Sequence, residues 1–215
     1  MRELVYLSDR KLAAFHPEPR RRPSLRAELG VPGVAKVGAE LAAAPGDGPG
    51  LAEVLAHLSE TPGKLRWYTE EDLRPGQWIQ FEARLGMVVM DLPSAPPVVF
   101  FAELDADPGT RLILHGSPGH LLETAGIPTV RPLYNGSPAI AIRRLLATIA
   151  DPGRDETAPI VVGGFHIRML LHQLGQTLDP RAAATMSGYA RVTVDAAEFG
   201  AVLASPLSVE YVSPR

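Results

Sequence analysis

The chain has 215 residues, 46% of them hydrophobic and 21% charged, with a formal net charge of −3. This length provides for one large domain or two small ones, and a slightly negative protein offers no general attraction to nucleic acid or an anionic membrane. The absence of cysteine excludes disulfides, thiolate nucleophiles and Cys-ligated zinc.

The N-terminal segment MRELVYLSDRK lacks the long apolar run of a signal peptide. No stretch of the chain reaches the roughly 18 uninterrupted apolar residues that suggest a membrane span. We therefore expect a cytoplasmic protein with no membrane and no nucleic acid among its partners.

The N-terminal third is expected to be mainly helical after one short strand. Residues 2–7 (RELVYL) predict the strand, and Ser8 or Asp9 then caps a short helix. Two further helical segments are expected at about 24–44 and 50–60, separated by a cluster of proline and glycine.

From Lys64 the hydrophobic period changes to two, which is typical of strands. The links between these stretches are mostly too short for parallel crossovers, so they predict an antiparallel meander. The expected strands are 64–69, 77–90, 97–104 and 110–115.

Helices and strands are both expected in the C-terminal half. Helices are predicted at 118–125 and 138–150, and the ambiguous stretch 159–174 is interpreted as helical from about residue 164. The closing strands are expected at 189–195, 201–204 and 207–212. Together the elements predict a single α+β domain over residues 1–215, with a mostly antiparallel sheet and helices packed on one face.

The motif that most suggests a functional site is His115-Gly116-Ser117-Pro118, at the end of a predicted strand. It differs from the serine-hydrolase elbow, because His115 stands where that motif needs glycine. Pro118 also lacks the N–H that would help to hold an oxyanion. Ser117 is instead predicted to cap the following helix, with proline at its first position. The same arrangement recurs at Ser137.

The histidine pairs are poorly spaced for a metal ion. His115 and His120 are five positions apart, and His166 and His172 are six apart. Neither pair has the i, i+4 spacing with which two imidazoles of one helix chelate an ion. No metal site is therefore expected.

The strand ending in His115-Gly116-Ser117, followed by Leu-Leu and then glycine, resembles the first NAD-contacting strand of ADP-ribosyltransferases. That resemblance implies that His115 holds the ribose of NAD, that Tyr134 packs on nicotinamide and that Glu210 stabilises the oxocarbenium ion. The chain departs from the pattern in the proline that directly follows Ser117. Strand alternation predicts that Glu210 faces away from the sheet interior, since Val209 beside it faces inward.

A second resemblance covers most of residues 2–212. Its segments are LVYLSDRKL at 4–12, LHGSPGHLL at 114–122, AIRRLL at 141–146 and LASPLSVEYV at 203–212. In this order they resemble an uncharacterised actinobacterial family of proteins of similar length, some linked to caspase/TPR-type (CATRA) conflict systems. The resemblance implies one α+β domain and a role in a defence or regulatory system, but no activity.

The leading functional hypothesis is a non-enzymatic binding or adaptor domain that recognises a protein partner or a small ligand without a cofactor. The candidate ligand-binding residues are His115, Ser117 and His120. The alternative is an NAD-dependent enzyme similar to ADP-ribosyltransferases, which would use His115, Tyr134 and Glu210.

Overall fold

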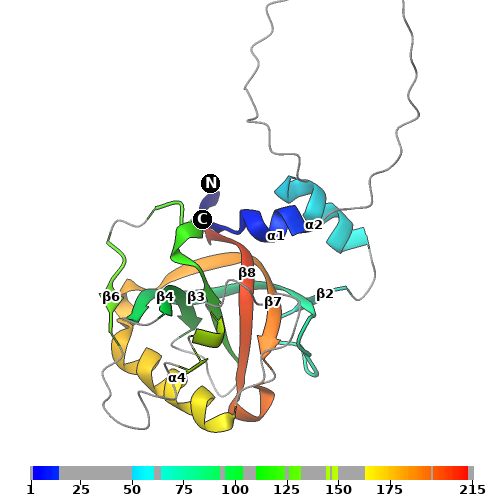
Figure 1. Cartoon of the computed structure of the whole chain (residues 1–215). Coiled ribbons are helices and arrows are strands. Elements are labelled where there is room, and N and C mark those ends of the chain that lie inside the picture. Colours follow the sequence, from blue (N-terminus) through cyan, green and yellow to red (C-terminus); the bar gives the residue numbers. More distant parts are fainter. Residues whose placement is uncertain are drawn as a thin grey trace, which may run out of the picture.

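The structure of the protein is a computed structural model, and strands predominate in its fold (Figure 1). It describes residues 2–14, 50–60, 64–92, 95–103, 110–123, 126–131, 144–145, 147–149, 163–194 and 196–212. The strands are β1 (Arg2–Leu7), β2 (Leu65–Trp67), β3 (Trp78–Leu92), β4 (Ala95–Glu103), β5 (Arg111–Gly116), β6 (Thr129–Val130), β7 (Ala184–Val194) and β8 (Ala201–Val212). The α-helices with named bounds are α1 (Asp9–Ala14), α2 (Leu51–Glu60) and α4 (Gly164–Thr177), and the 3₁₀ turns are η1 (Pro118–His120), η2 (Pro180–Ala182) and η3 (Ala197–Phe199).

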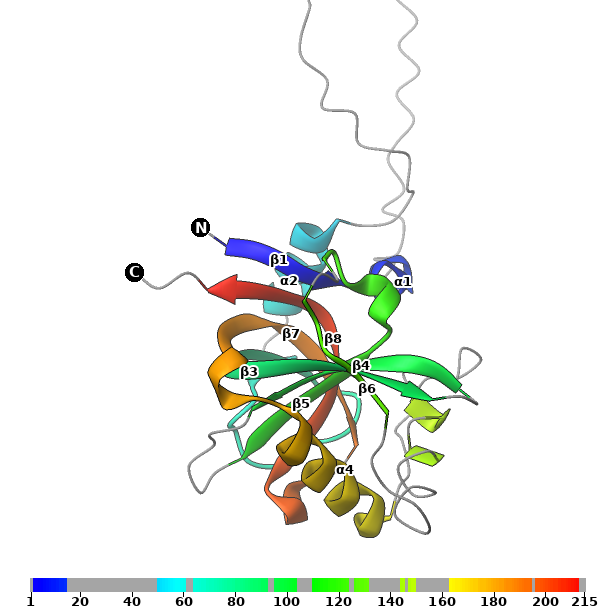
Figure 2. The same cartoon turned by 90° about the vertical axis from the view of Figure 1, so that its left-hand side faces the viewer.

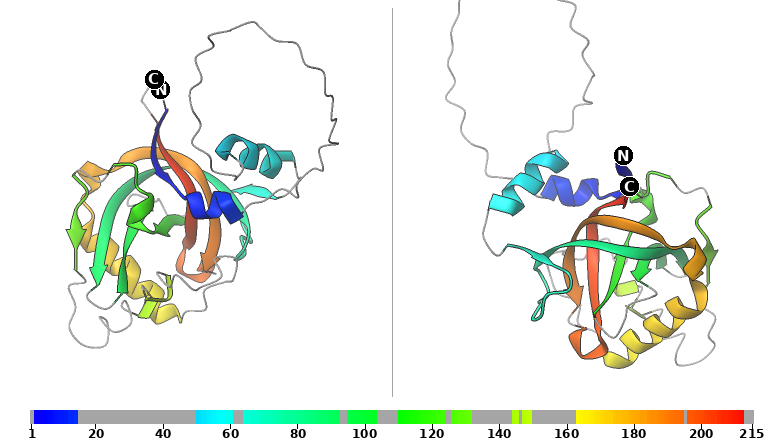
Figure 3. Two further views of the ribbon diagram at one scale, coloured as in Figure 1. Left: turned by 45° about the horizontal axis from the view of Figure 1, so that its top comes forward. Right: turned by 180° about the vertical axis from the view of Figure 1, so that it is seen from behind.

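The sheet closes on itself. Strands β3, β4, β5, β8 and β7 pair in that order, and β7 pairs back to β3. Every pair in this ring is antiparallel except β5 with β8. Figure 3 shows the strands wrapped around a common interior. Strand β1 pairs with β8 and is not part of the ring.

Apolar side chains fill the interior of the ring. Because successive residues of a strand point to opposite faces, alternate positions of every ring strand contribute to one cluster. Phe81, Phe101, Leu112, Leu114 and Val209 are examples, and none of them is more than 2% exposed. The interior is therefore a packed core rather than a cavity.

The helices cover separate parts of the outer surface. Buried residues of α4, such as Ile167 and Leu170, pack on a cluster that includes Phe100 and Ile113. The buried residues of α2 pack instead with Trp78 and others in a smaller cluster. In Figures 1 and 2, α4 lies at the opposite end of the molecule from α1 and α2. The structure confirms a mostly antiparallel sheet with few helices, but it does not confirm that the helices pack on one face.

Most of the expected elements are present. Strands β3, β4 and β5 are consecutive antiparallel neighbours, as their short links predict. The ambiguous stretch is helical from Gly164, and residues 144–145 and 147–149 are helical within the segment expected at 138–150. The helix expected at about 24–44 and the predicted cap Ser137 lie outside the described residues.

Three expectations about local structure are wrong. Strand β2 is parallel to β3, because the loop of residues 68–77 brings the chain back before β3 begins. The helix expected at 118–125 is the single turn η1, since the Leu122 N–H donates to the carbonyl of Val5 on β1 at 2.9 Å. The strands expected at 201–204 and 207–212 are one strand, because a register shift opposite Pro206 accommodates a residue that has no N–H to donate.

Candidate functional site

His115, the first of the predicted ligand-binding residues, is only 1% exposed near the end of β5. Its Nε2 lies 2.7 Å from the Thr193 hydroxyl, which donates to the carbonyl of Leu203 at 3.2 Å. Since that hydroxyl has a single proton, His115 Nε2 must be the donor in the first contact. These hydrogen bonds tie β5, β7 and β8 together, so the imidazole has a structural role.

Ser117 and His120 lie in the turn that follows β5. The Ser117 hydroxyl accepts a hydrogen bond from the Gly119 N–H at 3.2 Å, which confirms the predicted cap, although the capped element is only η1. The half-buried His120 ring lies edge-to-face with Tyr6, with centroids 5.7 Å apart. Both side chains therefore have contacts that shape a corner of the fold.

Glu210 is half-buried on the outer face of β8, and Val209 beside it belongs to the interior cluster, as alternation predicts. Glu210 lines a shallow groove whose lining residues do not include His115. Tyr134, the third residue of the NAD hypothesis, lies outside the described residues. The structure thus brings Glu210 together with a different set of residues from the predicted one.

This β3–β7–β8 groove has a volume of about 110 Å³ and runs across the outer face of three ring strands. Its lining residues are Trp67, Gln80, Phe81, Glu82, Ser187, Gly188, Tyr189 and Glu210. Glu82 pairs in register with Ser187, and Ser187 pairs in register with Glu210. The polar side chains at these three positions therefore form one row across the sheet, with the serine between the two carboxylates.

A second row of groove residues runs beside the first. Trp67 pairs with Gln80, and Gln80 pairs with Tyr189. All three side chains are half-buried. The groove thus combines an aromatic residue on each side of an amide with a row of two carboxylates and a hydroxyl.

Ser187 lies at the floor of the groove. It is 8% exposed, and its hydroxyl makes no hydrogen bond within the described part of the chain. The neighbouring Gly188 lets β7 and β8 approach closely, because a Cβ there would collide with the carbonyl of Ser208. Among the described residues, the buried side-chain atoms without a hydrogen-bond partner are His166 Nδ1 and Ser208 Oγ, so the Ser187 hydroxyl is instead open to the groove that it lines.

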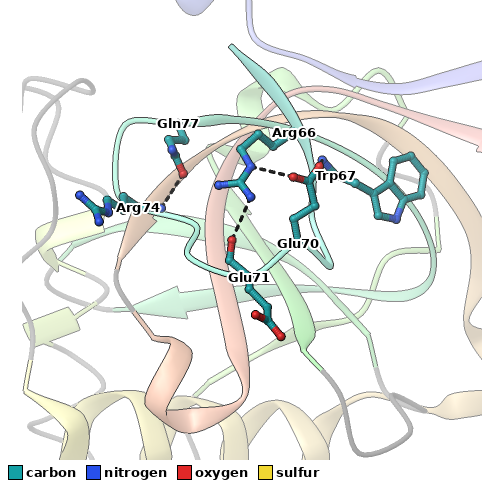
Figure 4. Close-up of polar contacts among 6 residues, drawn as sticks. All are labelled: Arg66, Trp67, Glu70, Glu71, Arg74 and Gln77. Atoms are coloured by element: carbon teal, nitrogen blue, oxygen red, sulfur yellow. Dashed lines mark hydrogen bonds and ion pairs between the residues drawn. The ribbon is translucent and has the colours of Figure 1, made fainter. Parts of the chain in front are cut away.

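Trp67 ends β2, and the loop between β2 and β3 holds its backbone through polar contacts (Figure 4). The Glu70 carboxylate accepts hydrogen bonds from the Trp67 N–H at 2.6 Å and from the Arg66 guanidinium at 2.8 Å. These two contacts, the backbone one first, lower the pKa of the Glu70 carboxyl below its usual value. The Arg74 N–H donates to the Gln77 side chain at 2.7 Å, and the Trp67 indole points away from the ion-paired groups.

A second hollow of about 110 Å³ lies between α4 and the ends of β4 and β5. Most of its lining is apolar, with Glu103 and Arg111 at its edge. Glu103 already accepts hydrogen bonds from the Tyr68 hydroxyl at 3.3 Å and from the Leu112 N–H at 3.1 Å. This hollow offers fewer polar groups to a ligand than the β3–β7–β8 groove does.

Sequence reasoning placed Glu210 on the outer face but found neither Glu82 nor Ser187. Glu82 falls in the strand expected at 77–90, but Ser187 precedes the strand expected at 189–195, because β7 already begins at Ala184. The register across β3, β7 and β8 cannot be predicted from the sequence. Among the described residues, no group of three or more histidines and carboxylates lies close enough to hold a metal ion. Within the same part of the chain, none of the helices has the length and apolar character needed to cross a membrane.

Comparison with known proteins identifies a family to which the chain is similar. The model of a family of unknown function (DUF7019) matches residues 2–213. No curated protein and no solved structure matches the chain.

Proposed function

The chain belongs to the DUF7019 family of unknown function, and we propose that it is a non-enzymatic binding domain that recognises its ligand through the β3–β7–β8 groove. The observation that carries this proposal is the row of Glu82, Ser187 and Glu210 on the outer face, in which the serine hydroxyl lies between two carboxylates and lines the groove. The groove presents hydrogen-bonding groups outward from a rigid, closed sheet, which is the arrangement of a recognition surface.

The interior of the ring supports the same conclusion. Small-molecule sites are typically concave spaces of about 300–1,000 Å³. The ring core is filled by apolar side chains, and the groove has only about 110 Å³. A ligand would therefore place one group in the groove while the rest of it lies on the surface, as a protein partner would.

The positions of the NAD-hypothesis residues favour binding over ADP-ribosyl transfer. That activity needs His115 and Glu210 to face one cleft. His115 is instead buried against Thr193, while Glu210 lines the groove without it. The proposal places the domain in the bacterial cytoplasm, in a regulatory or conflict system such as the CATRA-linked ones, with no cofactor.

The experiment compares photo-crosslinking from two exposed positions. A crosslinking amino acid at Thr185, on β7 close to the groove, is expected to capture a single protein, whereas one at Ala52 on α2 is the matched control. The captured protein is then purified and titrated against the wild-type chain and against Ser187→Phe, which fills the groove. Loss of binding in Ser187→Phe, with an unchanged unfolding midpoint, supports the proposal. Equal binding by both, or transfer of ADP-ribose from NAD by the wild-type chain, overturns it.

A further inference from the structure

We infer that the hollow between α4 and the ends of β4 and β5 binds the C-terminal residue of a partner protein. An aliphatic side chain of that residue enters the hollow, and its α-carboxylate pairs with Arg111. The residues that line this α4 hollow include none of those that line the β3–β7–β8 groove. The inference therefore goes beyond the proposed binding function and does not depend on it.

Aliphatic side chains form the walls of the α4 hollow. Ile113 belongs to β5, and Leu171, Leu174 and Leu178 belong to α4 and its C-cap. The hollow has a volume of about 110 Å³, whereas small-molecule sites are typically about 300–1,000 Å³. An apolar cavity of about 150 Å³ can hold benzene, so this hollow has room for one aliphatic side chain of a larger molecule.

Gly175 keeps the hollow open, and packing within the fold does not explain its presence. It lies inside α4 and lines the hollow, although glycine destabilises a helix relative to alanine. A Cβ at Gly175 would meet no neighbouring atom within 4 Å, whereas a Cβ at Gly164 in the same helix would overlap Phe199. The space without a side chain at Gly175 is therefore available to a ligand.

Arg111 supplies a positive charge at the edge of the hollow. It is half-buried, and its side chain makes no ion pair or hydrogen bond within the described part of the chain. Leu112 beside it packs in the ring interior, whereas Ile113 packs against α4. Alternation therefore directs the Arg111 side chain to the face that α4 covers. A guanidinium in this position can form two parallel N–H···O bonds with a carboxylate.

The nearby Glu103 carboxylate has other partners. It accepts hydrogen bonds from the Tyr68 hydroxyl at 3.3 Å and from the Leu112 N–H at 3.1 Å. Tyr68 packs with the interior cluster, whereas Ala102 packs in the cluster that α4 covers. Alternation therefore directs the Glu103 carboxylate to the face opposite α4, and the guanidinium of Arg111 is the charge that an occupant of the hollow meets.

A protein C-terminus presents both required groups on one residue. The α-carboxylate and the side chain are attached to the same carbon, so an aliphatic side chain in the hollow leaves the carboxylate at the edge, where Arg111 lies. Capture of a C-terminal carboxylate is a recurring mode of peptide recognition. An inorganic anion would leave the apolar walls uncovered, and Arg111 would repel a cation.

The test titrates acetylated pentapeptides of glycine and serine into the full chain and follows its leucine and isoleucine methyl signals by NMR. One peptide ends in leucine with a free carboxylate, the second in leucine amide and the third in serine. The leucine peptide is expected to bind at least about tenfold more tightly than either of the others. The amide loses the charge-assisted hydrogen bonds, and serine leaves the apolar walls uncovered. Equal affinity for the leucine peptide and its amide, or no binding of the leucine peptide at millimolar concentration, overturns the inference.

Two further arms identify the source of the carboxylate and the site. Isocaproate carries the aliphatic group and the carboxylate of leucine without a peptide. If isocaproate binds as tightly as the leucine peptide, a small acid is the ligand and the assignment to a protein C-terminus is wrong. Ser187→Phe fills the β3–β7–β8 groove and should bind the leucine peptide as the wild-type chain does. Loss of binding in this variant would place the peptide in the groove and overturn the inference.

Variants of the hollow complete the test. Arg111→Gln should weaken binding of the leucine peptide at least about tenfold, whereas Arg131→Gln, whose side chain is 76% exposed, is the matched control. Gly175→Leu should abolish binding because its side chain fills the hollow, and Ala56→Leu on the exposed face of α2 is its control. Both test variants should fold, because Arg111 has no side-chain partner to lose and a Cβ at Gly175 meets no neighbour. Wild-type affinity in either folded variant overturns the inference.

Discussion

Replacing Thr193 with valine removes one hydroxyl from the buried hydrogen bonds that join β5, β7 and β8. Thr193 is 2% exposed, and its hydroxyl both accepts from His115 and donates to the carbonyl of Leu203. Valine keeps the branched shape, so the change tests the hydrogen bonds rather than the packing. If His115 stabilises the fold, as these contacts indicate, Thr193→Val should lower the free energy of unfolding.

The magnitude follows from burial. Each lost hydrogen bond contributes about 0.5–1.5 kcal/mol net, and a buried donor left without an acceptor costs about 1–3 kcal/mol. His115 is 1% exposed, so water cannot readily replace the lost acceptor. We expect Thr193→Val to lower the free energy of unfolding by about 2–4 kcal/mol, a large fraction of the roughly 5–15 kcal/mol of a typical domain.

Urea denaturation followed by circular dichroism measures this difference. Thr185→Val is the matched control, because Thr185 is an exposed threonine on the same strand, and its change should stay within about 0.5 kcal/mol. A double-mutant cycle with His115→Ala should give a coupling energy of about 0.5–3 kcal/mol. A Thr193→Val protein as stable as Thr185→Val would refute the structural role of His115.

Three further predictions concern the core and a cap. Gly188→Ala should lower stability by about 1–3 kcal/mol in urea denaturation, because its Cβ would overlap a β8 carbonyl, whereas Gly175→Ala on open helix surface should not lower it. Burial, then the Glu103 carboxylate, raises the pKa of Tyr68 to about 12. The unfolded tyrosine ionises near pH 10, whereas the folded one does not. This contribution to the free energy of unfolding is therefore fully present below pH 10 and should decrease towards pH 12, by at most about 3 kcal/mol. Tyr68→Phe should remove this fall, and an unchanged pH profile would contradict it. Ser117→Ala should cost about 0.5–1 kcal/mol by thermal unfolding, and a loss above about 2 kcal/mol would show a role beyond the cap.

The candidate site could be predicted from the sequence only in part, because some of its features are local and others depend on strand pairing. The sequence indicated that Glu210 faces outward, because alternation follows from the local geometry of a strand. It also indicated the Ser117 cap, which depends on a few neighbouring residues. It did not predict that Glu210 would share a groove with Glu82 and Ser187, which come from strands far apart in the chain.

By itself, the sequence determined the features that depend on short-range periodicity and capping. These include the antiparallel run of β3, β4 and β5 and the helix beginning at Gly164. The tertiary structure alone decided that β5 lies parallel to β8, that β7 returns to β3 and that the sheet closes. Those pairings join segments distant in the chain, and they depend on how all the apolar faces can be buried at once. The same closure decided the groove, because only strand pairing sets which outward-facing residues become neighbours.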